Sequence, residues 1–471
     1  MIKTAIFLGA GASKADKAPI QSELFNDYFN IPSHVLNRNP QGMNEEIKSF
    51  FMDIFNINVD KHDKKEYPTF EEVLGMIDLA ELRNESFRNY QLENSFGFNE
   101  RIRKMRLYFV LLMARVLDYK LRQTNHVHEK LVQQLDRLDL LSNTCFISTN
   151  YDILIDNALS NLYRSNYGKK ELDYSIDFTN FDKPNDWKRP SVDAIKLLKL
   201  HGSLNWLYCP SCSSVTLTQY EKGIMSLLED RHQAKCDNCN TIRMPIIVPP
   251  TFYKDMSNIF LSSVWNKAEK YLSQVDHIVF CGYSLPDADI HIKYLLKRIQ
   301  TNRNGNLRIT VLNHFSGKSF TYMNEEIRRY LKFFGVQVEY LPFGFEDFAE
   351  NPQKFLMRNE SGSITYYNKL IRDKIPQIIQ VNGKKANVRV LDHEEYKNML
   401  DKKLQEELNK YLTANDEHQV EELADILEVV YAILESKGVS IEEFEKVRLA
   451  KKDDRGWFKE KLLLISVSEG L

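Results

Sequence analysis

The sequence predicts an α/β protein whose larger domain has a mainly parallel sheet, followed by a small all-helical unit. Strand-like apolar segments alternate with helical or irregular stretches over the first three quarters of the chain, which favours a parallel sheet. A long helical pattern over residues 44–141 interrupts this alternation, and helical patterns dominate the sequence after residue 365. A chain of 471 residues is also too long for one compact core, so two or three domains are expected.

The composition narrows the class of protein. Hydrophobic residues (43%) and charged residues (27%) have the shares of a folded, water-soluble protein. The 63 basic and 65 acidic residues nearly balance, so no overall field attracts anionic lipid, and nucleic acid is not expected as a partner. The first residues lack a secretory pattern, and no apolar stretch is long enough to cross a bilayer. We therefore expect a cytoplasmic protein without a membrane partner.

The order of elements follows from the apolar pattern. A first strand is expected in TAIFL (residues 4–8), before a glycine turn and the helical pattern SELFNDYF (22–29). The range 44–141 is far longer than one crossover helix, so it is interpreted as a helical insertion or cap. The irregular, polar range 351–365 predicts a linker between a domain over 1–350 and a unit over 366–471. Later strands are expected in NTCFISTNYD (143–152), IKLLKLHGSLNW (195–206), HIVFCGYSLPD (277–287) and LRITVLNHF (307–315).

Four of the six cysteines predict a metal site. They form two Cys-x-x-Cys pairs separated by a polar loop, which is close to the ligand spacing of a structural zinc ribbon, expected here over 205–245. Four thiolates close a tetrahedral shell and leave no position for substrate, so this zinc would hold a loop in place. Cys145 and Cys281 lie in strand-like segments and are expected to be buried, reduced thiols. The predicted ligands are Cys209, Cys212, Cys236 and Cys239.

Polar or glycine residues follow several predicted strands, where open parallel sheets form their ligand crevice. The turn Gly9-Ala10-Gly11-Ala12-Ser13 suits a pyrophosphate at a helix N-terminus, or it is merely a tight turn. Thr149-Asn150-Tyr151-Asp152 suits the same crevice, or caps a helix. Because the cysteines fill the metal shell, His201 is free for acid–base work, unless it is a structural histidine in a turn. Further strand ends carry Gly282, Tyr283, Ser284 and Asn313.

In this order, GAGAS, STNYD, KLHGSLNW, the two Cys-x-x-Cys pairs, GYSLPD and VLNHF resemble the sirtuin-like domains of bacterial antiphage defence proteins, over about residues 1–350. The resemblance implies a Rossmann-like NAD-binding fold with a small zinc module. In it, Asn150, His201 and Asp152 would be catalytic: Asn150 would position the attacking water, His201 would act as a base toward ribose hydroxyls, and Asp152 would lie near the carboxamide. The residues implied to contact NAD are Gly9, Ala10, Gly11, Ala12, Ser13, Thr149, Asp152, Gly282, Ser284 and Asn313.

Two departures from deacylating sirtuins bear on the reaction. Those enzymes carry Gln-Asn-Ile-Asp and an acyl-lysine cleft, whereas this chain has Thr-Asn-Tyr-Asp and a long helical insertion. Both departures favour an NAD glycohydrolase that releases nicotinamide and ADP-ribose, as an antiphage effector that depletes NAD. The alternatives are a nucleotide sensor without turnover, an NAD-dependent protein deacylase, and a pyrophosphohydrolase in the C-terminal unit. A homo-oligomer is expected, and a phage-derived trigger or a second defence subunit are candidate partners.

The C-terminal segment from Tyr367 to Phe458 is similar to MazG-like, all-α nucleotide pyrophosphohydrolases. That family holds magnesium with Glu-Glu-x-x-Glu on one helix and Glu-x-x-Asp on the next. Here Lys410 stands where the last glutamate of the first motif belongs, and an ammonium cannot ligate magnesium. Impaired or absent hydrolysis with retained nucleotide binding is therefore expected, although a site that uses Glu406 instead stays open. The candidate magnesium ligands are Glu406, Glu407, Glu422 and Asp425, and the candidate phosphate contacts are Lys369, Arg372 and Arg455.

Overall fold

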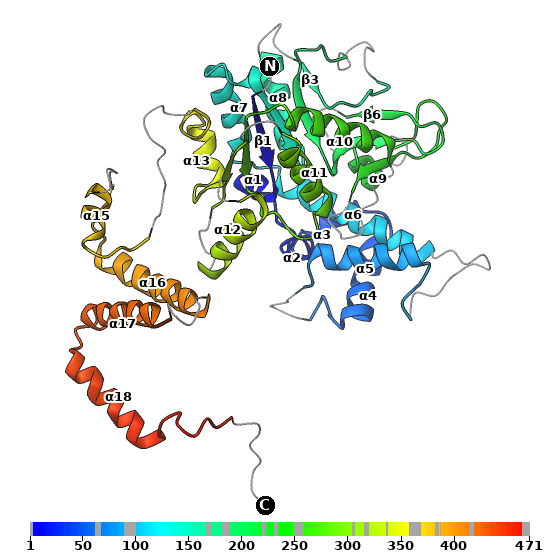
Figure 1. Ribbon diagram of the computed structural model, residues 1–471. Helices are drawn as coiled ribbons and strands as arrows, with labels where there is room; N and C mark the ends of the chain where they lie inside the picture. The colour runs from blue at the N-terminus through cyan, green and yellow to red at the C-terminus, as the bar shows by residue number, and fades with distance from the viewer. Residues whose placement is uncertain are drawn as a thin grey trace, which may run out of the picture. The chain divides into compact units, whose positions relative to one another are not determined.

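The computed structural model divides into two units, Met1–Ser363 and Ile364–Leu471, which are treated separately below (Figure 1). In the first unit the chain runs through a parallel sheet with helices on both sides, and the second unit is built from helices in its described part. The structure describes residues 3–61, 67–88, 100–165, 171–180, 189–218, 223–229, 234–248, 258–303, 307–314, 320–335, 338–357, 369–381, 386, 388–413 and 419–463.

A seven-stranded sheet forms the centre of the first unit, and every strand pair in it is parallel. The strand order is β10-β9-β8-β1-β2-β4-β3, which confirms the predicted α/β class. The central strands β1, β2 and β8 are mostly apolar and buried, because helices cover both faces of the sheet. The bounds are β1 Thr4–Leu8, β2 Thr144–Ser148, β3 Leu172–Asp173, β4 Ile195–Lys199, β8 His277–Cys281, β9 Arg308–Leu312 and β10 Val338–Leu341.

The direction of chain travel reverses at the middle of this sheet. From β1 the chain moves through β2 to β4, and it later returns to β8 and continues to β9 and β10. Parallel crossovers are right-handed, so helices of the two halves cover opposite faces, and β1 and β8 flank the switch point. Helix α7 Val127–Arg137 packs against both α8 Leu154–Ser165 and α13 Phe345–Glu350. The chain around β8 and β9 contributes the further helices α10 Ile259–Leu272, α11 Ile290–Thr301 and α12 Phe320–Phe334 (Figure 1).

The helices between β1 and α7 have a hydrophobic core of their own, rich in phenylalanine. Phe25, Phe51 and Phe109 meet edge to face in it, with ring centroids 4.8–6.2 Å apart. The residues that the insertion contributes to this core run from Ala18 to Leu117, whereas α7 packs on α8 and α13 beside the sheet. The packed insertion therefore differs from the expected range 44–141. Its helices are α2 Leu24–Phe29, α3 Ser33–Leu36, α4 Met43–Phe55, α5 Phe70–Arg83 and α6 Glu100–Lys120.

A small antiparallel sheet, in the order β6-β5-β7, carries the cysteines. Leu204 on its middle strand and Leu228 on the short helix between its strands join the hydrophobic core of the insertion. The fully buried Arg115 of the insertion donates to Glu229 at 2.6 Å and to Asn39 at 2.9 Å. The cysteine module and the insertion are therefore packed as one body. The elements of the module are β5 Gly202–Tyr208, β6 Val215–Leu217, α9 Met225–Glu229 and β7 Met244–Ile247.

The expected linker over 351–365 begins with structure. Helix α14 occupies Gln353–Leu356, and its Phe355 is buried against Phe348 at 5.7 Å between ring centroids. Residues 358–368 lie outside the described part of the chain. The hydrophobic core of the first unit therefore extends to at least Phe355.

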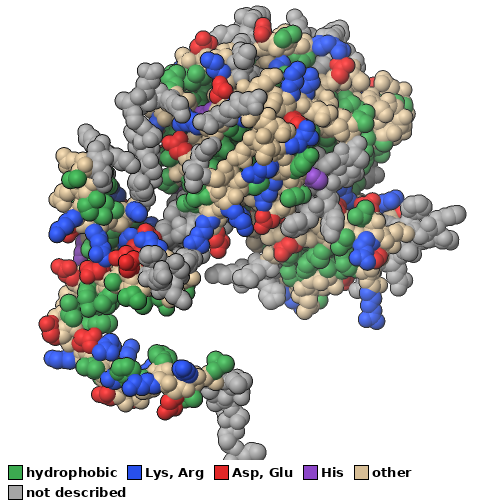
Figure 2. Space-filling model, in the orientation of Figure 1, with side chains coloured by type: hydrophobic (Ala, Val, Ile, Leu, Met, Phe, Trp, Pro, Cys, Tyr) green, Lys and Arg blue, Asp and Glu red, His purple; other side chains and the backbone are tan. Residues whose placement is uncertain are grey.

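The second unit consists of α15 Ile375–Val381, α16 His393–Thr413, α17 Gln419–Ser436 and α18 Ile441–Arg455 in its described residues. Helices α16 and α17 pack along each other and bury Leu400 and Val429. Several hydrophobic side chains of α17 and α18 remain at the surface, and green atoms mark such side chains along these helices in Figure 2. Across both units, none of the described helices has the length and apolar character needed to cross a bilayer.

Candidate functional site

The register of the parallel sheet brings five strand ends to one edge. Leu8, at the end of β1, is paired with Ser148 of β2 and Cys281 of β8. Ser148 is in turn paired with Lys199, and Cys281 with Leu312. The polar and glycine residues that follow these strands therefore line the carboxyl edge, on both sides of the switch point. Open parallel sheets bind their ligands at this place.

Glycines allow two strand ends to touch at the switch point. The amide of Gly9 donates to Cys281 O at 2.9 Å, and that of Gly11 donates to Gly282 O at 2.8 Å. A Cβ on Gly282, whose φ is +61°, would lie 2.2 Å from the nitrogen of Ala12. Only glycine fits there. The glycine segment is thus not a free loop: helix α1 (Ala10–Ala15) starts inside it, and some of its amides bond within the protein.

Asn150 connects the β2 end to the glycine segment. Its Nδ2 donates to Gly9 O at 2.8 Å and to Ser13 Oγ at 2.7 Å, and Ser13 Oγ donates to Asp152 Oδ2 at 2.6 Å. Both amide hydrogens are used in this way, and none of the described residues donates to Oδ1 of Asn150. An acceptor that can orient water or a hydroxyl group therefore remains on a side chain held from two sides.

Asp152 is turned inward. It is 5% exposed, accepts from Ser13 through Oδ2 and accepts the amide of Leu154, at the start of α8, through Oδ1 at 3.0 Å. The carboxylate therefore organises the β2 end and the beginning of α8, as the helix-capping interpretation expected. Its backbone carbonyl accepts from Nζ of Lys199, which is fully buried and forms an ion pair with Asp156 at 3.0 Å.

His201 lies two residues after β4 and is 4% exposed. Its backbone is held firmly, because Leu200 N donates to Ser148 O and Val248 N donates to His201 O, both at 2.9 Å. The ring of Tyr151 lies beside the imidazole, with centroids 6.3 Å apart and planes at 28°. The hydroxyl of Tyr151 donates to Val248 O at 2.7 Å. The ends of β2, β4 and β7 thus hold the backbone at His201, and its imidazole lies beside the ring of Tyr151.

Asp289, which the sequence reasoning did not single out, lies next to His201 and is held by Tyr283 of the β8 end. Asp289 Oδ1 lies 3.8 Å from Nε2 of His201, and Tyr283 OH donates to Asp289 Oδ2 at 2.8 Å. Burial raises the pKa of Tyr283 well above its usual value, so the hydroxyl stays a donor. Asp289 directly precedes α11 and follows the GYSLPD segment by two residues. The sequence did contain a signal for Asp289, namely an acidic residue directly before a helix that follows a strand end.

The other predicted contacts at this edge differ in accessibility. Thr149 and Ser284 are half-buried, whereas Asn313 is 6% exposed. The Nδ2 of Asn313 donates to Tyr283 O at 3.2 Å and to the carboxylate of Glu326, which also accepts from Tyr340 OH at 2.6 Å. Asn313 therefore holds β9 to β8 and α12, and its amide hydrogens are used inside the protein.

The four predicted zinc ligands lie together. Their sulfur atoms are all within 4.8 Å of one another, with Cys209 and Cys239 at 3.3 Å and Cys212 and Cys236 at 3.6 Å. The two Cys-x-x-Cys turns match: Ser213 N donates to Cys209 O at 2.9 Å, and Asn240 N donates to Cys236 O at 2.8 Å. Four convergent thiols on paired turns are a donor set that fits Zn²⁺. The thiols of Cys145 and Cys281 are buried and free, as expected.

In the second unit, Glu407, Glu422 and Asp425 have carboxylate oxygens within 4.8 Å of one another. Cations already occupy this group. Lys410 Nζ lies 2.7 Å from Glu407 Oε2 and Lys403 Nζ 2.7 Å from Glu407 Oε1, while Arg372 pairs with Asp425. Burial raises the pKa of Glu407, but the two lysine hydrogen bonds outweigh it and the net shift is downward. These contacts do not fit a magnesium site.

The remaining C-terminal candidates take other partners. Glu406 lies outside this carboxylate group and pairs with Lys403 at 3.0 Å and with Lys369 at 3.8 Å. Lys410 lies 3.6 Å from Glu406 and 2.7 Å from Glu407, so Glu407 is its closer partner. Arg455 is exposed and pairs with its neighbour Asp454 at 3.5 Å. Of the predicted phosphate contacts, Arg372 is thus nearest to the acidic group.

Replacing Lys410 by glutamate is expected to create a divalent-cation site. The change removes one of the two ammonium groups that lie 2.7 Å from Glu407 and adds a fourth carboxylate beside Glu422, and carboxylate oxygens are ligands that magnesium prefers. Titration calorimetry with MgCl₂ and MnCl₂ should give no binding heat at the acidic group of the natural chain and a submillimolar site in K410E. Lys402→Glu, an exposed residue on the same helix, is the charge-matched control. Equal magnesium binding by the natural chain and K410E would contradict the expectation.

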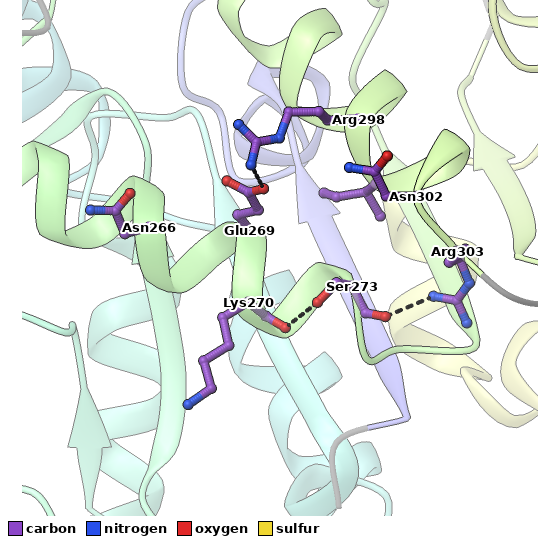
Figure 3. Close-up of a pocket in the computed structure, with 8 residues that line it drawn as sticks. Asn266, Glu269, Lys270, Ser273, Arg298, Asn302 and Arg303 are labelled. Carbon is purple, nitrogen blue, oxygen red and sulfur yellow. Dashed lines mark hydrogen bonds and ion pairs between the residues drawn. The ribbon is translucent and has the colours of Figure 1, made fainter.

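A pocket of about 450 Å³ lies elsewhere, between the ends of α10 and α11 (Figure 3). Two of its arginines have partners: Arg298 contacts Glu269 at 2.5 Å and Arg303 donates to Ser273 O at 3.3 Å. Helix α10 ends just before β8 begins, so the pocket is at the amino edge of the sheet, opposite the strand ends described above. None of the predicted site residues lines it.

Among protein families, residues 144–338 match the model described as a SIR2-like domain. The matched range starts with β2 and ends with the first residue of β10, so it includes Asn150, His201 and Asp289 but not β1 and the glycine segment. A comparison with curated proteins gives no significant match. The match supports NAD-dependent activity of the sirtuin kind in general.

Solved sirtuin structures are similar to this chain at low identity. A structure described as the basis of sirtuin substrate affinity is 15% identical and has a TM-score of 0.31, with 75% of this chain and 92% of that chain covered. A Sir2 structure in complex with an inhibitor, 2′-O-acetyl-ADP-ribose and a deacetylated peptide is 14% identical with a TM-score of 0.31, over 75% of this chain and 93% of that chain.

Proposed function

We propose that this chain, which carries a SIR2-like domain over residues 144–338, hydrolyses NAD to nicotinamide and ADP-ribose. The observation that carries the proposal is the double anchoring of Asn150 at the switch point, where its Nδ2 is bound to Gly9 O and Ser13 Oγ. A side chain fixed in this way presents one acceptor to the crevice at no further ordering cost. Such preorganisation is what a water nucleophile needs.

The chemistry requires little from the protein. The nicotinamide of NAD is a cationic leaving group, so the electrons of the C1′–N bond pass to its nitrogen without an acid. Water, oriented by Oδ1 of Asn150, forms the new bond to C1′ and loses one proton, and the products are nicotinamide, ADP-ribose and H⁺. His201 serves as a base toward a ribose hydroxyl and thereby stabilises the positive charge that develops on the ribose.

The surroundings of His201 favour hydrolysis over deacylation. Tyr151, which replaces the isoleucine of the deacylase motif, lies against the imidazole and bonds to Val248 O at 2.7 Å. Tyr151 also packs against the hydrophobic core of the helical insertion. The space beside the base is therefore bounded by an aromatic ring and by the insertion, which suits water better than an acyl-lysine side chain.

Further parts of the proposal concern the biological role. The resemblance to antiphage defence proteins supports an effector that depletes NAD after infection, in a homo-oligomer restrained until a phage-derived trigger or a second subunit acts. The C-terminal unit, in which lysines neutralise the acidic group, is proposed to bind nucleotides or assemble the protein without hydrolysing substrate.

Incubation of the full chain with NAD, followed by chromatography of nicotinamide and ADP-ribose, tests the proposal. We expect both products in equal amounts and no requirement for an acylated peptide. Product formation only when an acetyl-lysine peptide is added would identify a deacylase instead. Binding of NAD by calorimetry without products, in the presence of phage lysate as well as its absence, would identify a sensor.

A further inference from the structure

Asp289 is placed where an N-terminal helix cap is expected, but it does not cap. The residue immediately precedes α11, and aspartate at that position usually accepts a backbone N–H of the first turn. No side-chain capping bond is formed here. The carboxylate is instead turned toward Tyr283, whose hydroxyl donates to Oδ2, and toward Nε2 of His201, 3.8 Å from Oδ1.

Burial strengthens the electrostatic interaction between His201 and Asp289. Asp289 is 6% and His201 4% exposed, so little water screens them. The hydroxyls of Tyr151 and Tyr283 lie against the pair, and burial raises the pKa of both well above the usual value. Two carboxylates of the helical insertion, Glu71 and Asp78, also act on the Tyr151 hydroxyl and raise its pKa further. The two hydroxyls therefore stay neutral, and Asp289 is the carboxylate whose oxygen lies 3.8 Å from Nε2 of His201.

We propose that Asp289 is the positioning residue of His201. The inference rests on the proposed role of His201 as the base of NAD hydrolysis. A carboxylate beside Nε2 favours the tautomer that carries its hydrogen on that nitrogen and leaves Nδ1 as the basic atom. When His201 takes a proton from a ribose hydroxyl, the imidazolium that forms faces the Asp289 anion. Tyr283 holds the second carboxylate oxygen and so fixes the direction of the first.

The titration of His201 tests this arrangement without any need for turnover. In the full chain labelled with ¹⁵N-histidine, the resonance of His201 is identified by its loss in H201A. Neutralising the carboxylate in D289N is expected to lower the pKa of His201 by about one to two units, because an opposite charge at this distance stabilises the imidazolium. D289E should return the pKa to within about half a unit of the natural value. If D289N does not fold, D289S replaces it.

Kinetics separate the inference from the proposed function. In D289N we expect kcat to fall by about tenfold or more, KM for NAD to change less than about threefold, and the acid limb of the pH–rate profile to move to lower pH. Asp287→Asn, an exposed residue paired with Lys293 at 2.6 Å, is the matched control and should leave all three quantities unchanged. An unshifted His201 titration in folded D289N overturns the inference even if NAD is hydrolysed. Absence of NAD hydrolysis with a shifted titration overturns the proposed function alone.

Discussion

Replacing Asn150 by alanine is expected to reduce NAD hydrolysis by about a hundredfold to a thousandfold, the loss that follows removal of one oriented polar group from a reaction centre. The same side chain holds Gly9 and Ser13, so the alanine variant also loosens the glycine segment. Its effect on kcat should therefore exceed that of Ser13→Ala, which removes one anchor of Asn150 but keeps the acceptor. Release of nicotinamide under saturating NAD gives the measurement.

Two controls separate chemistry from folding in this experiment. Asn161→Ala changes an exposed asparagine on α8, whose amide contacts Glu129 at 3.3 Å, and should retain full turnover. Thermal unfolding of each variant shows whether the fold survives. Full turnover by N150A, or equal losses in N150A and N161A, would refute the role of Asn150.

Loss of one zinc ligand is expected to have the largest effect on stability. Metal analysis of the natural chain should give one zinc ion per chain, and Cys209→Ser should abolish it and lower the free energy of unfolding by at least about 3 kcal/mol. The effect reaches beyond the cysteine turns because Leu204 and Leu228 of the module belong to the insertion core, and Arg115 bonds to Glu229. Chemical denaturation monitored by tryptophan fluorescence, which reports on the buried Trp206 of β5, measures the change.

Cys145→Ala is the matched control, because it removes a buried thiol of β2 that lies outside the zinc cluster. It should leave the zinc content unchanged. A natural chain that binds no zinc, or a C209S variant that unfolds at the natural denaturant concentration, would show that the four thiols are not a structural metal site.

Local patterns predicted the sheet and much of the candidate site. The apolar segments at 4–8, 143–148 and 277–281 were recognisable as strands because both faces of a parallel sheet are buried. The short β3 and β10 were missed, since a strand of two to four residues with polar members leaves no readable pattern. The segment IKLLKLHGSLNW forms two strands, β4 and β5, which belong to different sheets. The sequence pattern could not separate them, because the strands that each pairs with lie outside this segment.

The glycine segment illustrates where local reasoning ends. Its composition suited a phosphate loop or a tight turn equally well. In the folded chain Gly9 and Gly11 meet Gly282, which is more than 270 residues away in the sequence, and a side chain at any of these positions would overlap backbone atoms. The glycines are thus required by the approach of β1 and β8, a contact that no window of sequence contains.

By itself, the sequence determined which residues are chemically able to act: the four cysteines, Asn150, His201, and the lysine that stands in the C-terminal acidic motif. Only the tertiary structure decided how they are used. It placed Asp289 beside His201, joined Asn150 to the glycine segment, and paired Lys410 with Glu407 in preference to Glu406. The physical reason is that hydrogen bonds and ion pairs act over a few ångströms, and strand register and helix packing decide which distant residues come that close.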